Sequence, residues 1–275
     1  MRIHATQCSI AELPSKKGAI HAVDGKGRRY YAKTQWCPKT HRASPAWIAN
    51  ECVYYTIARR SRLRMPEGVI LEINGQLCWG SEYLAGRNKL PKIDSARLLL
   101  QVCQNSREEL LSLARALLLD LALLNSDRKP WNMLASQGDG GRRILWYFDH
   151  DKSLLGDARE PEDVPAGDFG RIHLASATDA KVADYFACAE ANDLILGGLT
   201  DREIHDIFGD LALNAGSLEV ARKECPNEWL SESQFARMEA FLTMWWRHLR
   251  ERFHSRSPRT YLAALLRQRG LASVP

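Results

Sequence analysis

Three polar residues in the middle of the chain carry functional groups suited to phosphate chemistry. Asp127 and Asn132 lie five residues apart in a polar stretch, and Asp149 ends the next apolar run. In phosphoryl transfer from a metal-bound nucleotide, one Asp orients the attacking hydroxyl, while an Asn five residues later and a second Asp hold Mg²⁺ on the phosphates. The residues alone are equally consistent with an aspartate that caps a helix before an ordinary hairpin.

The segments around these residues are expected to bring them together. Residues 106–124 are rich in leucine and alanine at helical spacing, which predicts a buried helix that ends at the polar stretch. Residues 133–135 and 144–148 predict the two arms of a β-hairpin, with a glycine-rich turn at 138–141. The loop that carries Asp127 and Asn132 would then lie beside the strand end that carries Asp149.

This stretch resembles the catalytic and metal-binding motifs of the HipA-like kinases, which are related to phosphoinositide kinases and more distantly to eukaryotic-type protein kinases. The resemblance is specific at Asn-Ser-Asp-Arg-Lys-Pro-x-Asn, residues 125–132, and at Phe-Asp-His-Asp, residues 148–151. It implies an α+β, two-lobed, protein-kinase-like fold. Residues 1–84 would form a nucleotide-binding lobe with a small antiparallel β-sheet and one helix, and residues 85–275 a mostly helical catalytic lobe.

The resemblance also implies a role for each polar residue. Asp127 would orient the acceptor hydroxyl and take its proton, and Asn132 and Asp149 would bind the metal, with Asp151 as a further metal contact. The implied cofactors are ATP and Mg²⁺. Because members of the family phosphorylate protein Ser or Thr, several as toxin-like regulators, a protein substrate and a regulatory or antitoxin-like partner are expected.

Two charged residues in the first part of the chain are expected to pair. Residues 3–34 alternate like a three-strand meander, and Lys33 near its end resembles the family lysine that reaches the α- and β-phosphates. Glu51 lies among apolar residues of a helix predicted at 46–60, where a carboxylate needs a positive partner. The alternatives are an exposed strand lysine and a solvated glutamate on the helix flank.

Two further segments would contact the nucleotide if the resemblance holds. The turn at 14–18 would lie over the phosphates, although it lacks the G-x-G-x-x-G pattern and is equally consistent with a surface hairpin. The segment after a hairpin turn at Asn74-Gly75 resembles the hinge that bonds adenine through its backbone. The residues concerned are Ser15, Lys17 and Gly18 in the turn, with Ser15 also a candidate autophosphorylation site, and Glu82, Tyr83 and Leu84 in the hinge.

The later part of the chain predicts a long loop and then helices. The loop at 152–171 contains Asp168-Phe169-Gly170, a tripeptide that marks the metal aspartate of eukaryotic-type kinases; here no strand precedes it, and we interpret it as a coincidence. Apolar periodicity and capping residues predict the other helices. Their expected ranges are 94–103, 179–190, 200–213, 217–223 and 231–253.

Composition limits the class of protein. The chain has 275 residues with 45% hydrophobic content, enough for one large domain or two lobes. A net charge of +5 is too small to argue for nucleic-acid binding. Seven irregularly spaced cysteines predict reduced thiols, and no signal peptide or membrane span is apparent, so a cytoplasmic location is expected.

Two other functions stay open. An aminoglycoside-type phosphotransferase acting on a small molecule shares the same catalytic logic, and the acidic loop at 157–168 would suit a cationic acceptor. A catalytically weak pseudokinase or binding module would explain the missing glycine-rich signature, whereas the intact Asp127, Asn132 and Asp149 argue against it.

Overall fold

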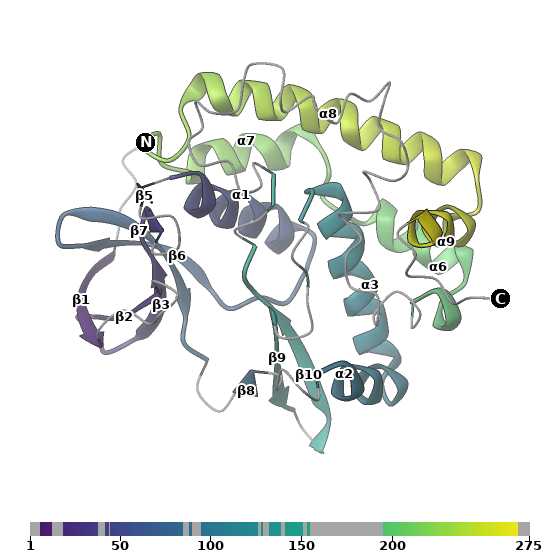
Figure 1. The fold of residues 1–275 in the computed structure, drawn as a ribbon, viewed down its shortest axis with the longest axis horizontal. Coiled ribbons are helices and arrows are strands. Elements are labelled where there is room, and N and C mark those ends of the chain that lie inside the picture. The colour runs from purple at the N-terminus through teal and green to yellow at the C-terminus, as the bar shows by residue number, and fades with distance from the viewer. Residues whose placement is uncertain are drawn as a thin grey trace.

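The chain combines a β-sheet N-terminal part with a helical C-terminal part, an α+β architecture (Figure 1). A computed structural model describes residues 6–12, 19–37, 42–43, 45–84, 88–89, 95–125, 128, 132–138, 141–150, 153–154 and 195–268. The N-terminal sheet consists of β1 (Thr6–Glu12), β2 (Ala19–Asp24), β3 (Arg29–Lys33), β6 (Gly68–Ile73) and β7 (Gln76–Glu82).

The N-terminal sheet closes on itself as a small barrel. Its strand order is β1-β2-β3-β7-β6, and β1 also pairs with β6. The β1–β6 pairing is parallel and places Cys8 opposite Ile73, so the expectation of a purely antiparallel sheet is wrong here. Closure removes the exposed sheet edges. The interior is apolar and contains Ile20, Ala22, Tyr30, Ala32, Leu71, Ile73 and Cys78.

Local sequence signals explain the turns of this barrel. Asn74 and Gly75 join β6 to β7 with φ angles of 52° and 77°, as expected of an Asn-Gly type I′ turn. Between β2 and β3, the carboxylate of Asp24 accepts the backbone N–H groups of Lys26 and Arg28, each at 2.9 Å. The turns at 24–27 and 74–75 are therefore formed, whereas the predicted turn at 14–18 lies outside the described residues.

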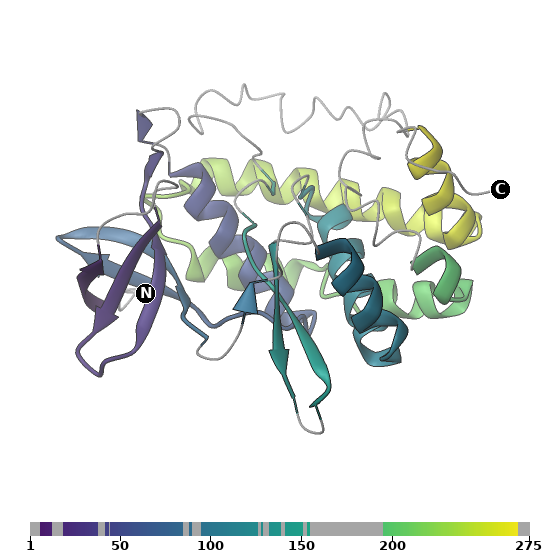
Figure 2. The same cartoon turned by 60° about the horizontal axis from the view of Figure 1, so that its bottom comes forward.

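Helix α1 (Ala46–Arg60) has the bounds that the sequence predicts and lies beside the barrel in both views (Figures 1 and 2). It follows two short strands, β4 (Trp36–Cys37) and β5 (Arg42–Ala43). Most of α1 is buried, and it packs against α7 (Ala215–Glu224). The helix that carries Glu51 therefore contacts both parts of the protein.

The C-terminal part contains a second sheet. The strands β8 (Asn88–Lys89), β9 (Met133–Gln137) and β10 (Arg143–Tyr147) pair in the order β10-β9-β8. The β9–β10 hairpin lies between the barrel and α3 in both views (Figures 1 and 2). The remaining helices are α2 (Ser95–Gln104), α3 (Arg107–Ala122), α6 (Asp201–Gly209), α8 (Glu232–Ser255) and α9 (Pro258–Gln268).

Most predicted helices of this part are present, with small shifts. Thr200 and Ser231 form the capping boxes that begin α6 and α8. Helix α7 begins at Ala215, earlier than expected, because Asn214 caps it. Helix α9 and the two-residue strand β8 were not among the predicted elements. The predicted helix at 179–190 and nearly all of the loop at 152–171 lie outside the described residues.

Two tryptophans fix the end of α3, where the candidate catalytic loop begins. The indole Nε1–H groups of Trp245 and Trp246 donate to the carbonyls of Leu121 (3.2 Å) and Ala122 (3.0 Å). Both rings project from α8 and are buried. Among the described residues, none of the helices is both long and apolar enough to cross a membrane.

Candidate active site

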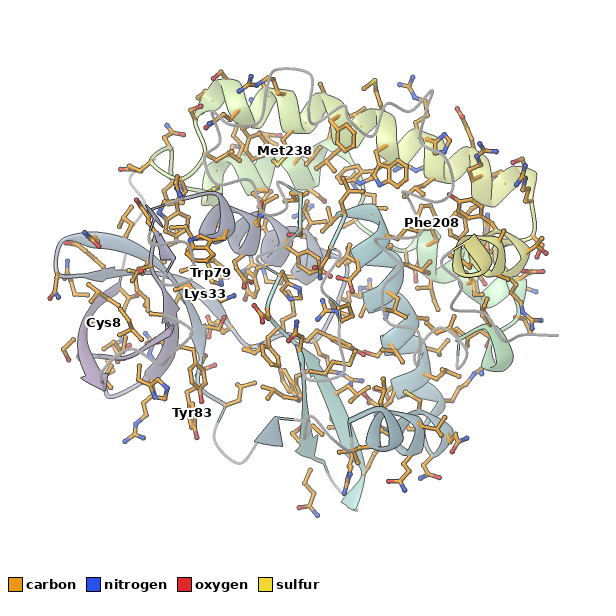
Figure 3. The ribbon with its side chains drawn as sticks, in the orientation of Figure 1. Cys8, Lys33, Trp79, Tyr83, Phe208 and Met238 are labelled. Atoms are coloured by element: carbon orange, nitrogen blue, oxygen red, sulfur yellow. The ribbon has the colours of Figure 1, made fainter. Side chains whose placement is uncertain are left out.

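Lys33 lies at the meeting point of three chain segments. Its Nζ is 2.5 Å from Glu51 Oε1 on α1 and 2.6 Å from Asp149 Oδ1, just after β10. The Glu51 side chain is only 4% exposed, whereas those of Lys33 and Asp149 are 29% and 31% exposed. A buried carboxylate requires such a cation. The structure thus places in contact the two residues that the sequence pairs, and Figure 3 shows Lys33 on the side of the barrel that faces the helices.

Asp149 is held beside Asn132 by the register of the hairpin. Tyr147 pairs with Met133, and the N–H of Phe148 donates to the Asn132 carbonyl at 3.3 Å. Asp149 itself has a left-handed φ of 65°, which is uncommon outside glycine and persists where neighbouring contacts impose it. Asn132 is 3% exposed. The hairpin therefore brings one carboxylate and one amide to the same strand end.

Arg128, which follows the predicted catalytic aspartate, is a buried residue that the sequence analysis did not single out. The Arg128 guanidinium is fully buried and binds the carboxylate of Asp120 on α3. Burial opposes its charge, but the Asp120 carboxylate outweighs burial and raises the pKa of Arg128. One sequence signal pointed to it, because Asp120 lies in an apolar helix and needs a cation.

His150 follows Asp149 and is neutral in the folded protein. Its Nδ1 lies 2.9 Å from Arg128 Nη2 and accepts a hydrogen bond, since arginine only donates. Burial, followed by the charges of Arg128 and Lys33, lowers the pKa of His150 well below its ordinary value. This contact gives His150 a hydrogen-bonding role in the folded chain.

The predicted hinge begins at Glu82, the last residue of β7. The N–H of Glu82 donates to the Glu67 carbonyl at 2.8 Å, and the N–H of Tyr83 donates to the Arg29 carbonyl at 2.7 Å. Two backbone donors of this segment therefore serve the protein itself, and adenine binding by Glu82, Tyr83 and Leu84 stays a prediction. The Tyr83 ring is 42% exposed and tilts against Tyr31 with 5.4 Å between centroids (Figure 3).

Several predicted site residues lie outside the described residues, namely Asp127, Asp151, Ser15, Lys17 and Gly18. The two described residues nearest Asp127 are anchored. Asn125 Nδ2 donates to Asp120 Oδ1 at 2.8 Å, and Arg128 binds the same carboxylate. The ends of the segment that carries Asp127 are therefore fixed to α3.

The described donor set suits a hard cation. Asn132 and Asp149 supply amide and carboxylate oxygens, which Mg²⁺ prefers in combination with substrate phosphates rather than in an all-protein cage. No group of three or more His, Cys, Asp or Glu in a metal-binding arrangement occurs within the described part of the chain. A surface cavity of about 500 Å³ near α3 and α6 includes no predicted site residue among its described lining.

Comparisons with known proteins bear on the fold. No protein-family profile and no curated protein matches the sequence. Among solved structures, the crystal structure of the Helicobacter pylori proinflammatory kinase CtkA is similar, with a TM-score of 0.60 and 12% sequence identity over 92% of this chain and 98% of that chain. At this level of identity, the similarity shows that the chain has a kinase-like fold.

Proposed function

We propose that this protein is an ATP- and Mg²⁺-dependent kinase that transfers the γ-phosphate to a hydroxyl group, with a protein Ser or Thr as the acceptor. The observation that carries the proposal is the position of Lys33 Nζ between Glu51 and Asp149, residues 18 and 116 positions away in the sequence. A cation held by a buried acid, next to a second acid at a strand end, suits the binding of metal-bound phosphates. The kinase-like fold and the two HipA-like motifs support the same chemistry.

The two-lobed division belongs to the proposal. Residues 1–84 would form the nucleotide-binding lobe and residues 85–275 the catalytic lobe. The pairing of β8 with β9 supports a boundary just before β8, because this short strand belongs to the C-terminal sheet. The contact of α1 with α7 would then join the lobes.

Each residue has a distinct part in the proposed reaction. Lys33 binds the nucleotide phosphates, and Glu51 keeps the ammonium group in place. The acceptor oxygen forms a bond to the γ-phosphorus while the bond to the β–γ bridging oxygen breaks and ADP leaves, and Asp127 takes the hydroxyl proton. Asn132 and Asp149 would hold Mg²⁺, which when bound neutralises charge on the transferring phosphate.

Before nucleotide binds, Lys33 and Asp149 form an ion pair with each other. The 2.6 Å contact offsets the charge of both groups. Phosphates that bind Lys33 would replace Asp149 as its partner and leave the carboxylate for the metal. The proposal therefore expects nucleotide and metal to bind more tightly together than either does alone.

The test is a phosphate-transfer assay. The full chain is incubated with γ-labelled radioactive ATP and Mg²⁺, with and without cell lysate, beside Asp149→Asn and the surface control Arg202→Gln, whose side chain is 91% exposed. We expect labelled protein bands with the wild type and the control, and labelling weaker by on the order of 10²-fold or more with Asp149→Asn. Absence of transfer by folded wild type, together with no rise in its melting temperature in Mg-ATP, would refute the proposal.

A further inference from the structure

Arg128 is the centre of a buried polar cluster behind the candidate site. Its Nε lies 2.7 Å from Asp120 Oδ2, and its Nη2 lies 3.0 Å from Asp120 Oδ1. This is a two-point ion pair between two side chains with no exposed surface. Arginine is seldom buried to this degree unless it is paired, and the fork of the guanidinium fixes its orientation as well as its position.

The other donors of Arg128 reach the chain on both sides of Asp149. Nη1 donates to the carbonyl oxygens of Asn132 at 3.3 Å and Phe148 at 3.1 Å. Nη2 donates to His150 Nδ1 at 2.9 Å. Phe148 and His150 are the immediate neighbours of Asp149. The Arg128 side chain therefore forms hydrogen bonds with both residues that flank Asp149 and with the backbone of Asn132.

The same cluster reaches α1 through Tyr54. The Tyr54 hydroxyl donates to Asp120 Oδ1 at 2.7 Å and lies 3.5 Å from Arg128 Nη2. The Tyr54 ring stacks on His150 with 3.8 Å between centroids and 7° between planes. Tyr54 lies three residues after Glu51 on α1. The helix that holds Lys33 through Glu51 is thus packed on the cluster that holds Asp149.

The buried cluster supports the unusual backbone conformation of Asp149. A φ of 65° is uncommon for a residue other than glycine, and contacts from the surroundings stabilise it. The ladder bond from the Phe148 N–H to the Asn132 carbonyl supports one side. Arg128 supplies bonds on both sides of Asp149, and its own place is fixed by Asp120 on α3.

We propose that Arg128 is a positioning residue. It holds the strand end that carries Asp149, and the backbone of Asn132, in place next to α1. This inference deepens the proposed kinase function and rests on it for its effect on catalysis. The ordering of the backbone by Arg128 does not depend on any activity. The two parts can therefore be measured separately.

The variants separate the charge of Arg128 from its fork. Arg128→Lys keeps a cation next to Asp120 and is expected to fold, but the three N–H donors of an ammonium group are too few to bond Asp120, both carbonyls and His150 at once. Arg128→Gln removes the charge as well and is the more disruptive change. Arg202→Gln, on the exposed face of α6, is the matched arginine control.

Hydrogen exchange of the unliganded proteins tests the ordering. For Arg128→Lys we expect faster amide exchange in peptides that cover 132–137 and 145–150, with α8 unchanged, and no change anywhere near the site in Arg202→Gln. Unaltered exchange at 145–150 in folded Arg128→Lys would overturn the inference. An equal increase in α8 would also overturn it, because that pattern means general destabilisation rather than positioning.

Kinetics test the effect on catalysis. We expect kcat of Arg128→Lys to fall by on the order of 10²-fold, as misplacement of reacting groups by about 1 Å does, and the apparent affinity for Mg²⁺ to fall by about 10–100-fold. At saturating Mg²⁺, KM for ATP should change little, because the Lys33–Glu51 pair is kept. Wild-type kcat and Mg²⁺ dependence in this variant would overturn the catalytic part. A folded wild type that transfers no phosphate and shows no rise in melting temperature in Mg-ATP would instead refute the kinase proposal, while the exchange result still decides the positioning.

Discussion

His150 gives the stability of the folded chain a pH dependence that can be measured. Its imidazole is 3% exposed and faces the guanidinium of Arg128, the ammonium of Lys33 and the ring of Tyr54. Burial and these two positive charges lower the pKa of His150 well below its ordinary value of 6.5. In the unfolded chain the imidazole titrates near its ordinary value. Below that pH, the unfolded state binds a proton that the folded state does not.

The size of the effect follows from proton linkage. The contribution of His150 to the free energy of unfolding is complete above the unfolded pKa and is lost as the pH falls below it. Once the unfolded imidazole is protonated, the loss is about 1.4 kcal/mol per pH unit. Between about pH 7.5 and pH 5, it amounts to about 2 kcal/mol.

His150→Asn isolates this contribution, because an amide oxygen can accept the Arg128 hydrogen bond but does not titrate. The free energy of unfolding is measured by urea denaturation of both proteins at about pH 7.5, 6 and 5. We expect the variant to be less stable at the highest pH, because it loses the stacking on Tyr54, and the difference to narrow by about 2 kcal/mol at the lowest pH. Two parallel stability curves would refute the claim that the buried imidazole is neutral.

Three other substitutions test separate parts of the account. Lys33→Met should fold but lose on the order of 10²-fold in initial rate, because the phosphates lose a preorganised cation; wild-type turnover would contradict this. Burial opposes ionisation of Asp24, yet hydrogen bonds led by those from Arg28 lower its pKa to about 2. Its stabilising effect should therefore be present above about pH 4 and fade toward pH 2, so in acid titrations the stability difference from Asp24→Asn should shrink, and a constant difference would count against it. Trp246→Phe should lose roughly 1–3 kcal/mol in urea denaturation by leaving a buried carbonyl of α3 without its donor, whereas unchanged stability would exclude that role.

Local signals predicted the elements that position the site. Apolar spacing predicted the bounds of α1 correctly, and Asn74-Gly75 predicted its hairpin turn. The capping boxes at Thr200 and Ser231 predicted where α6 and α8 begin. In each case the signal lies within a few residues of the feature, because caps and turns are stabilised by neighbouring backbone groups.

Long-range contacts were harder to predict. The hydrogen-bond partners of Arg128 include residues as distant in sequence as Tyr54 and His150. Nothing in the sequence immediately around Arg128 marks it as buried. Charged residues are usually exposed, so a local pattern assigns it to the surface. The direct Lys33–Asp149 contact and the parallel pairing of β1 with β6 were also missed, because each joins residues far apart in the sequence. The short strand β8 has too few residues to show any period.

The most direct test of the central claim compares two aspartates that a motif search would confuse. Asp149 is fixed at the end of a strand, 2.6 Å from Lys33. Asp168 belongs to the Asp-Phe-Gly tripeptide in the acidic segment and lies outside the described residues. The measurement is the initial rate of γ-phosphate transfer for the wild type, Asp149→Asn and Asp168→Asn, with folding checked by thermal melts. The account predicts a loss on the order of 10²-fold or more for Asp149→Asn and little change for Asp168→Asn. An active Asp149→Asn beside an inactive Asp168→Asn would contradict it.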